Sequence, residues 1–464
     1  MRRAITYIFL ISITLLGPIR LAAQLPPSTA SRIDSVVQKA LAETSAPSAS
    51  IAVVKDGQIA YVKAYGNSRL DPASPASPEM RYPIGSVSKQ FMAACVLLLV
   101  QDGKLSLDDR VSKYLPSLTR AQDITVRELL SHTSGYQDYY PLDYVAPFMQ
   151  QPVTADGILD RWAKKPLDFE PGTAWQYSNT NYVAVGRIVE TVTGMPAFAF
   201  LKSRILEPLG MTSAIDVDTQ SLTDTDAAGY TRFGPSPPRP VTPEARGWLF
   251  AAGELAMTSR DLARWDQSLM EGKLLKASSL DQMITPVRLK NGAPTDYGLG
   301  VGVSNADGHP RLSHGGAVSG FVSDNVVWLD QGAAVAVLTN LDGSRAAGTI
   351  ANQIGPILLE GQEDPEAPNA LARAKQVFSE LQEGKIDRAL LTPDADAYFT
   401  PQVVADAAAG LKPLGAPAAF EQSGFQLRGG MSYRHFRIRF ASGTTLNLST
   451  FFTSDGKLAQ FLIQ

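Results

Sequence analysis

Two side chains suited to nucleophilic catalysis, Ser86 and Lys89, lie three residues apart at the start of an apolar stretch. Residues 86–101 favour helix and leave little polar face, so we expect a buried helix on which both side chains share one face. A desolvated lysine has a lowered pKa and can take the proton of a nearby serine hydroxyl. In the alternative interpretation, Ser86 caps the helix and Lys89 extends to water.

A second motif is formed by Tyr177 and Asn179, which are separated by one residue. A phenol beside a lysine ammonium loses its proton more easily and can serve as a base. The amide of Asn179 can hold a substrate carbonyl or fix Lys89. Tyr65 and Asn67 have the same spacing at the end of a predicted strand, so this motif by itself identifies no site.

A third motif, His314-Gly315-Gly316-Ala317, falls in a predicted strand. Glycine in a strand allows a substrate backbone to approach closely. The amide hydrogens of Ser86 and Ala317 would then form an oxyanion hole, where negative charge develops during acyl transfer. The alternative is a kink in the sheet with a histidine that has only a structural role.

The motifs occur in the order Ser-x-x-Lys, Tyr-x-Asn and His-x-Gly. This order, with the turn at 130–135 between the first two motifs, resembles the class C β-lactamase and penicillin-binding-protein-like serine hydrolase family. The segment 252–263 is also similar to that family. The resemblance covers residues 28–360.

The resemblance implies a role for each residue of the first two motifs. By it, Ser86 is the nucleophile, Lys89 is its proton partner, Tyr177 is the general base and Asn179 contacts the substrate. His132 then braces its own turn and takes no part in the chemistry. The residues of the third motif, His314, Gly316 and Ala317, contact the substrate.

The sequence departs from the family at His314, where β-lactamases of this kind usually have a lysine that binds the substrate carboxylate. A neutral imidazole, with an ordinary pKa of about 6.5, carries only a fractional charge at neutral pH. We therefore expect substrates that need no carboxylate and weak hydrolysis of β-lactams. The segment 323–325 spells Ser-Asp-Asn, a motif of the class A enzymes, but it follows the third motif, and we interpret it as accidental. No Gly-x-Ser-x-Gly surrounds Ser86, which argues against an α/β-hydrolase.

The composition is that of a globular protein with two domains. The chain has 464 residues, of which 44% are hydrophobic and 19% charged, and a net charge of -3. This near-neutral balance gives no sign of nucleic-acid binding. Four histidines without metal-ligand spacing and a single cysteine, Cys95, indicate no metal, no cofactor and no disulfide within the chain.

The N-terminus has the pattern of a secretory signal. Arg2 and Arg3 precede an apolar stretch at 4–17, and small residues follow up to Ala23. We expect a signal peptide over 1–23 and a secreted or periplasmic protein. The apolar stretch is short for a bilayer, although an uncleaved anchor is the alternative.

The order of predicted elements over 28–360 indicates an α+β fold. Strands at both ends enclose a mostly helical middle region, so we expect one antiparallel sheet, flanked by helices, that contains the first and last strands. We expect a helix at 33–41, a loop at 67–82, and strands at 50–54, 59–62, 297–303, 311–314, 320–329 and 333–338.

A polar segment at 361–369 is predicted to link this region to a second domain. Residues 370–464 contain predicted helices followed by strands, which indicates a small α+β domain without a catalytic set. This order resembles the cone-shaped domains of the nuclear-transport-factor and cystatin type.

We interpret the sequence as an exported serine hydrolase that forms an acyl-enzyme on Ser86. Its substrate is a small molecule or peptide: an ester, an amide or a D-amino-acid peptide. A β-lactamase or D-alanyl-D-alanine carboxypeptidase is one alternative. A catalytically silent cell-wall-binding or sensor protein is another, although such a protein need not keep Ser86, Lys89 and Tyr177 together. The oligomeric state does not follow from the sequence.

Overall fold

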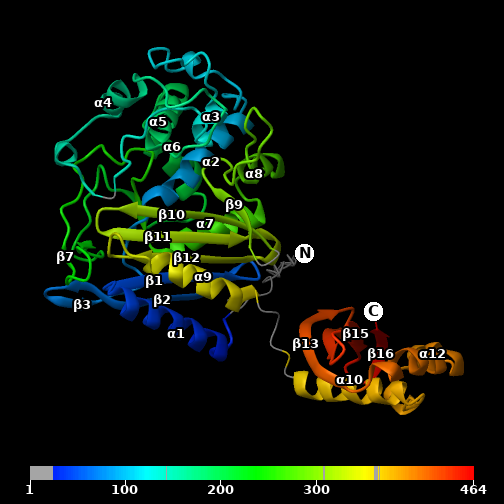
Figure 1. Ribbon diagram of the computed structural model, residues 1–464. Coiled ribbons are helices and arrows are strands. Elements are labelled where there is room, and N and C mark those ends of the chain that lie inside the picture. Colours follow the sequence, from blue (N-terminus) through cyan, green and yellow to red (C-terminus); the bar gives the residue numbers. More distant parts are fainter. Residues whose placement is uncertain (1–23, 143, 307–308, 360–363, 365, 464) are drawn as a thin grey trace, which may run out of the picture. The chain divides into compact units, whose positions relative to one another are not determined.

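The computed structural model describes residues 24–142, 144–306, 309–359, 364 and 366–463. The expected signal peptide at 1–23 lies outside the described residues. The chain divides into two compact units, Met1–Leu359 and Glu360–Gln464, which are described separately (Figure 1).

The first unit is built on an antiparallel sheet to which seven described strands belong. Strand β1 pairs with β12, and Ile51 lies opposite Val337, so the expectation that the first and last strands share a sheet is confirmed. In spatial order the strands are β3 (Ala73–Pro75), β2 (Gln58–Leu70), β1 (Ser48–Lys55), β12 (Ala333–Thr339), β11 (Phe321–Trp328), β10 (His309–Val318) and β9 (Gly302–Ala306).

Helices cover both faces of this sheet, which confirms the α+β class. Helices α1 (Pro27–Thr44) and α9 (Ala346–Leu359) pack on one face, and the larger helical region lies on the other (Figure 1). All residues of β12 are buried, because this strand lies inside the sheet and is covered on both sides. A strand buried on both faces has a continuous apolar sequence in place of an alternating one.

The helical region is centred on α2 (Ser88–Gln101), in which residues 88–99 are all buried. Ser86 lies on a single 3₁₀ turn, Gly85–Val87, which runs directly into this helix, so the expected helical stretch from Ser86 to residue 101 is confirmed, with its first turn tighter than an α-helix. The other helices of the region are α3 (Val126–Leu130), α4 (Ala155–Ile158), α5 (Asn179–Thr193), α6 (Ala197–Leu201), α7 (Ser259–Glu271) and α8 (Ala277–Ile284).

Short strands connect the helical region to the turn of Ser86. Strand β8 (Leu255–Met257) pairs with both β4 (Tyr82–Pro83) and β5 (Ile215–Asp216). A separate pair is formed by β6 (Tyr230–Thr231) and β7 (Arg239–Pro240).

Two segments differ from the sequence expectation. The expected loop at 67–82 contains the end of β2, all of β3 and the start of β4. The expected strand at 297–303 starts only at Gly302, because Gly300 has a φ of +75° and so breaks the extended conformation.

The second unit is a small α+β domain in which helices precede strands. Helices α10 (Ala367–Gln382), α11 (Pro393–Tyr398) and α12 (Pro401–Leu411) are followed by strands β13 (Pro417–Arg428), β14 (Met431–Phe440), β15 (Thr445–Phe452) and β16 (Leu458–Ile463). Its core includes Phe378, Phe436 and Leu448. Asp364 forms a buried ion pair with Arg434, so this part of the expected linker packs within the second unit.

Within the described residues, no single helix has both the length and the apolar character needed to cross a membrane. One bent pair, Asn179–Thr193 with Ala197–Leu206, meets that test by length and composition only.

The separate cores lead to a prediction about truncation. A chain that covers residues 24–359 should fold and hydrolyse a small activated ester, because both faces of its sheet are covered by its own helices. Circular dichroism and thermal unfolding would measure folding, with residues 24–464 as the control. A truncated chain that is folded but inactive would mean that residues beyond 359 complete the site.

Candidate active site

The turn that carries Ser86 is fixed by hydrogen bonds on both sides of Ile84. The amide of Ile84 donates to Leu255 O at 2.9 Å, and its carbonyl accepts from Ser323 Oγ at 2.7 Å. Leu255 belongs to β8 and Ser323 to β11, so two different sheets hold the turn. Ser323 was interpreted as part of an accidental motif, but the structure gives its hydroxyl a role in positioning the nucleophile.

Two glycines allow strand β10 to pack against this turn. Gly85 has a φ of +51°, and a Cβ there would lie 2.8 Å from the nitrogen of Ala317. A Cβ on Gly316 would lie 1.9 Å from Ile84 O. Gly316 therefore makes room for the turn of Ser86, where the sequence suggested room for a substrate. The same packing brings the nitrogen of Ala317 against Gly85, the residue before the nucleophile, and the oxyanion hole itself stays a prediction.

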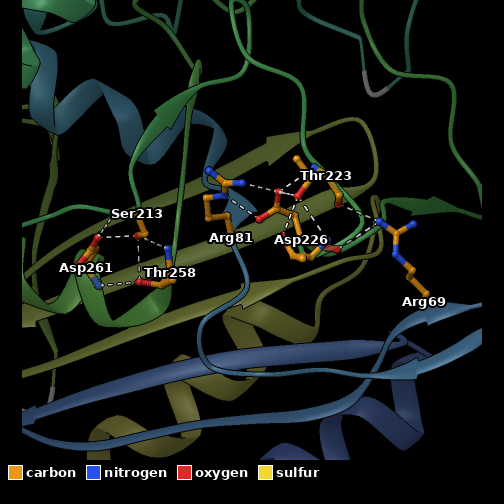
Figure 2. A network of polar contacts seen from close by, with 8 residues as sticks. Arg69, Arg81, Ser213, Thr223, Asp226, Thr258 and Asp261 are labelled. Carbon is orange, nitrogen blue, oxygen red and sulfur yellow. Dashed lines mark hydrogen bonds and ion pairs between the residues drawn. The ribbon is translucent and has the colours of Figure 1, made fainter.

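The chain just before β4 is held by a bidentate ion pair. Figure 2 shows Arg81 donating two hydrogen bonds, both of 2.7 Å, to the carboxylate of Asp226. Thr223 donates to the same carboxylate through its amide and its hydroxyl, and Arg69 donates to Thr223 O. Paired and hydrogen-bonded charges of this kind fix geometry well. The segment that leads to Ser86 is thus anchored to Asp226, a residue far from it in the sequence.

A second group in Figure 2 fixes the chain after β8. The amide and hydroxyl of Ser213 both donate to Asp261, and the amide of Thr258 donates to Ser213 Oγ. The hydroxyl oxygen of Thr258 also accepts from the amide of Asp261 and so caps helix α7. The chain is therefore held both before β4 and after β8, the two paired strands beside the nucleophile turn.

The amine of Lys89 is fully buried among three oxygens. Its Nζ lies 2.9 Å from Ser86 Oγ, 2.8 Å from Asn179 Oδ1 and 2.7 Å from Ala252 O. Burial lowers its pKa to about 7. The amide and carbonyl oxygens can only accept, whereas the serine hydroxyl can also donate. The ammonium form donates to all three oxygens, whereas the neutral amine can donate to Asn179 and Ala252 and accept from the hydroxyl of Ser86.

Asp138 sets the orientation of Asn179. Its Oδ1 accepts from the backbone amide of Asn179 at 2.9 Å and from Asn179 Nδ2 at 3.1 Å. Because Nδ2 faces Asp138, Oδ1 faces Lys89. The negative charge of Asp138 also raises the pKa of Lys89, against the larger effect of burial. Sequence reasoning missed Asp138, and no spacing links it to Asn179, since the two meet only in the fold.

Tyr177 is buried beside Ser86 as a neutral phenol. Burial raises its pKa, although the nearby serine hydroxyl acts in the opposite direction. The phenol oxygen makes no hydrogen bond of ordinary geometry with any described residue. Lys89 Nζ lies 5.0 Å from the centre of the ring. The structure therefore opposes the expectation that Tyr177 loses its proton easily.

His132 packs against the segment that carries Tyr177. Its Nδ1 accepts from the amide of Ser178 at 3.2 Å, and its ring lies 4.3 Å from that of Tyr177. Burial lowers its pKa well below the ordinary value, so the ring is neutral. His132 thus braces the segment of Tyr177, in addition to the turn in which it was expected to act.

Both ring nitrogens of His314 have hydrogen-bond partners within the protein. Nδ1 lies 2.7 Å from Gly315 O, and Nε2 lies 2.7 Å from the hydroxyl of Tyr297. A carbonyl only accepts, so we assign the proton to Nδ1, and Nε2 accepts from Tyr297. Burial lowers the pKa of His314 to about 4, so the ring carries no charge at neutral pH. Tyr297 was not found from the sequence.

A cavity of about 1040 Å³ opens above the nucleophile. Tyr139, Tyr140 and Tyr144 line one side of it, and β10 and the start of α9 line another. Lys89 lies buried beneath it, whereas the remaining predicted site residues all line it: Ser86, Tyr177, Asn179, His314, Gly316 and Ala317. The described residues contain no group of three or more His, Cys, Asp or Glu that could hold a metal ion.

Comparison with known proteins places this site in a family. The protein-family model described as Beta-lactamase matches residues 33–355. Penicillin-binding protein 4* of Bacillus subtilis is 28% identical over 305 residues, which cover 62% of this chain and 67% of that protein.

Solved structures agree on the fold. A D-stereospecific amidohydrolase from Streptomyces is 29% identical, with a TM-score of 0.61, over 69% of this chain and 96% of that one. An octameric penicillin-binding protein homologue from Pyrococcus abyssi is 21% identical, with a TM-score of 0.63, over 94% of this chain and 100% of that one.

Asp138 gives the first prediction for the site. In Asp138→Asn, the amide of Asn179 can turn its NH₂ group toward Lys89, and kcat/KM should fall about tenfold, as for a lost hydrogen bond to a charged group. Removal of the carboxylate should also lower the pKa of Lys89, so the rise of kcat/KM with pH should move to lower pH. An unchanged pH profile together with a lower rate would assign Asp138 a merely structural role.

Proposed function

We propose that this chain, which belongs to the beta-lactamase family, is an exported serine hydrolase that cleaves D-amino-acid amides, peptides or esters through an acyl-enzyme on Ser86. Members of this family are serine hydrolases, and the chain is an enzyme of that class. The observation that carries the mechanism is the buried amine of Lys89, 2.9 Å from Ser86 Oγ, with a pKa of about 7. The D-amino-acid substrate is supported by the 29% identity to a D-stereospecific amidohydrolase.

Acylation starts with proton transfer from Ser86 Oγ to the neutral amine of Lys89. The serine oxygen attacks the substrate carbonyl carbon, and the amides of Ser86 and Ala317 bind the oxyanion. When the C–N bond breaks, Tyr177 donates its proton to the leaving amine and regains one from Lys89. Water then attacks the ester carbonyl and gives a proton to Lys89, which returns it to Ser86.

This assignment of roles differs from the one implied by the sequence resemblance. The resemblance implied that Tyr177 is the general base. Here Lys89 is the base and Tyr177 the proton donor, because burial favours the neutral forms of both groups. Asn179 acts on Lys89, and its contact with substrate remains a prediction.

A neutral His314 supports substrates that need no carboxylate. The family lysine would offer a fixed cation, whereas this ring is uncharged and already hydrogen-bonded.

One observation favours a β-lactamase or D-alanyl-D-alanine carboxypeptidase as the second candidate. Arg345 lines the same cavity and forms no ion pair with any described residue, so a substrate carboxylate has a possible partner there.

Export is proposed from the segment 1–23 alone. Its two arginines, apolar stretch and final small residues fit a signal peptide.

The alternative of a catalytically silent binding protein is disfavoured by the short contact between Lys89 and Ser86, since a binding protein has no need of a neutral amine there.

The mechanism predicts a rise of activity with pH. Only the neutral amine of Lys89 is active, and with a pKa of about 7 it is scarce at pH 5 and abundant at pH 8. kcat/KM on a neutral ester should therefore increase through about pH 7 and level off above it.

Ser86→Ala should abolish turnover, and Lys89→Ala should lower kcat/KM at least about 10²-fold. Activity that is retained in Ser86→Ala would exclude the acyl-enzyme.

The neutral ring of His314 predicts substrate preference. The wild-type chain should hydrolyse a short-chain p-nitrophenyl ester with a higher kcat/KM than a chromogenic cephalosporin. His314→Lys should shift the ratio toward the cephalosporin, because it introduces a cation beside the oxyanion hole. If the wild type prefers the cephalosporin tenfold or more, the β-lactamase alternative replaces this proposal.

A further inference from the structure

Strand β10 has a free edge next to the nucleophile. Strand β9 pairs with it only from His309 to Ser313. In the described part of the chain, no strand pairs with that edge over residues 314–318. An extended acyl chain can bind along such an edge as an added strand. Along β10, Gly315 and Ala317 are exposed, and the residues between and beside them are buried.

A carboxylate lies one strand in from this edge, on strand β11, which pairs with the other side of β10. Asp324 lies opposite Gly315 in the β10–β11 register, so both positions face the same side of the sheet. On that side, α9 packs over β11 and β12 and leaves Gly315 of β10 exposed (Figure 1). Asp324 lines the same cavity as Ser86.

Two glycines leave the carboxylate accessible. A Cβ on Gly315 would have only Ser323 O within 4 Å, at 3.9 Å, so the space above this position is open. On the other side, a Cβ on Gly348 of α9 would lie 3.3 Å from Asp324 Oδ2. A side chain at 315 would extend into the space in front of the carboxylate. The absence of both side chains therefore opens a path from the strand edge to Asp324.

The carboxylate of Asp324 has no partner of its own. No hydrogen bond or ion pair joins it to another described residue. Arg311 is close enough to lower its pKa, but this guanidinium donates its hydrogen bond to Asn352 Oδ1 at 2.9 Å. Burial has the larger effect and raises the pKa of Asp324 to about 6, so the group remains mainly ionised at pH 7.5.

We propose that Asp324 binds a primary ammonium group on the acyl part of the substrate, so that the enzyme favours D-amino-acid residues with a lysine-like side chain. This inference rests on the proposed function and extends it by naming the side chain. Gly315 is two residues from Ala317, or about 7 Å along a strand. A flexible four-carbon stem can span such a distance, and its compact ammonium fits a narrow, glycine-lined gap. Thr349 and Asn352 line the same cavity and offer further oxygen acceptors.

The turnover experiment compares D-lysine p-nitroanilide with D-norleucine p-nitroanilide at pH 7.5, since these side chains differ chiefly in the ammonium group. Asp324→Asn should lower kcat/KM about tenfold for the lysine substrate and leave the norleucine substrate within about twofold, as expected for a charge-assisted hydrogen bond. Asp330→Asn, at an exposed position after β11, removes the same charge away from the cavity and should change neither value. Equal losses on both substrates, or no loss on either, would overturn the proposal.

A binding experiment separates this proposal from the proposed function. Isothermal titration of the Ser86→Ala chain should show D-lysinamide binding about tenfold more tightly than D-norleucinamide, and addition of Asp324→Asn should remove the difference. Equal affinities in the Ser86→Ala chain would overturn the subsite, whatever the enzyme hydrolyses. If the difference is present but the wild type hydrolyses neither anilide nor amide, the subsite stands and the proposed function fails.

Discussion

The burial of one amine governs the chemistry of this protein. Lys89 lies without solvent exposure between Ser86, Asn179 and Ala252, and the loss of water brings its pKa to about 7. A solvated lysine would hold its proton at neutral pH and leave Ser86 unactivated. The apolar helix α2 and the packing around it are therefore conditions for reactivity as well as for folding.

The groups around that amine satisfy its hydrogen bonds but favour its charged form, so the fall in its pKa comes from burial. Two of its three neighbours only accept hydrogen bonds, and Asp138 prevents the Asn179 amide from turning the wrong way. The negative charge of Asp138 opposes the fall in pKa that burial causes. The balance between desolvation and the nearby carboxylates of Asp138 and Glu254 sets the pH range over which the enzyme works.

The same low polarity shapes recognition. His314 and His132 are both uncharged because they are buried. The one ring proton of His314, on Nδ1, is donated to the carbonyl of Gly315. Charged side chains line other parts of the same cavity, among them Asp324 and Arg345. Selectivity for charged substrates is thus separated in space from the neutral catalytic centre, where a charge would disturb Lys89.

The sequence alone determined the three motifs, the apolar segment after Ser86, the strands at 50–54 and 59–62 and the α+β class, because these depend on residue type and on local periodicity. It did not determine the roles of Asp138, Tyr297 or Asp324, which meet their partners through the fold: Asp138 and Asn179 are 41 residues apart. It also suggested an easily ionised Tyr177, whereas the tertiary structure decided for a neutral phenol. The reason is physical: residue types fix which groups can ionise, but the water removed by packing, which no local pattern records, decides which of them do.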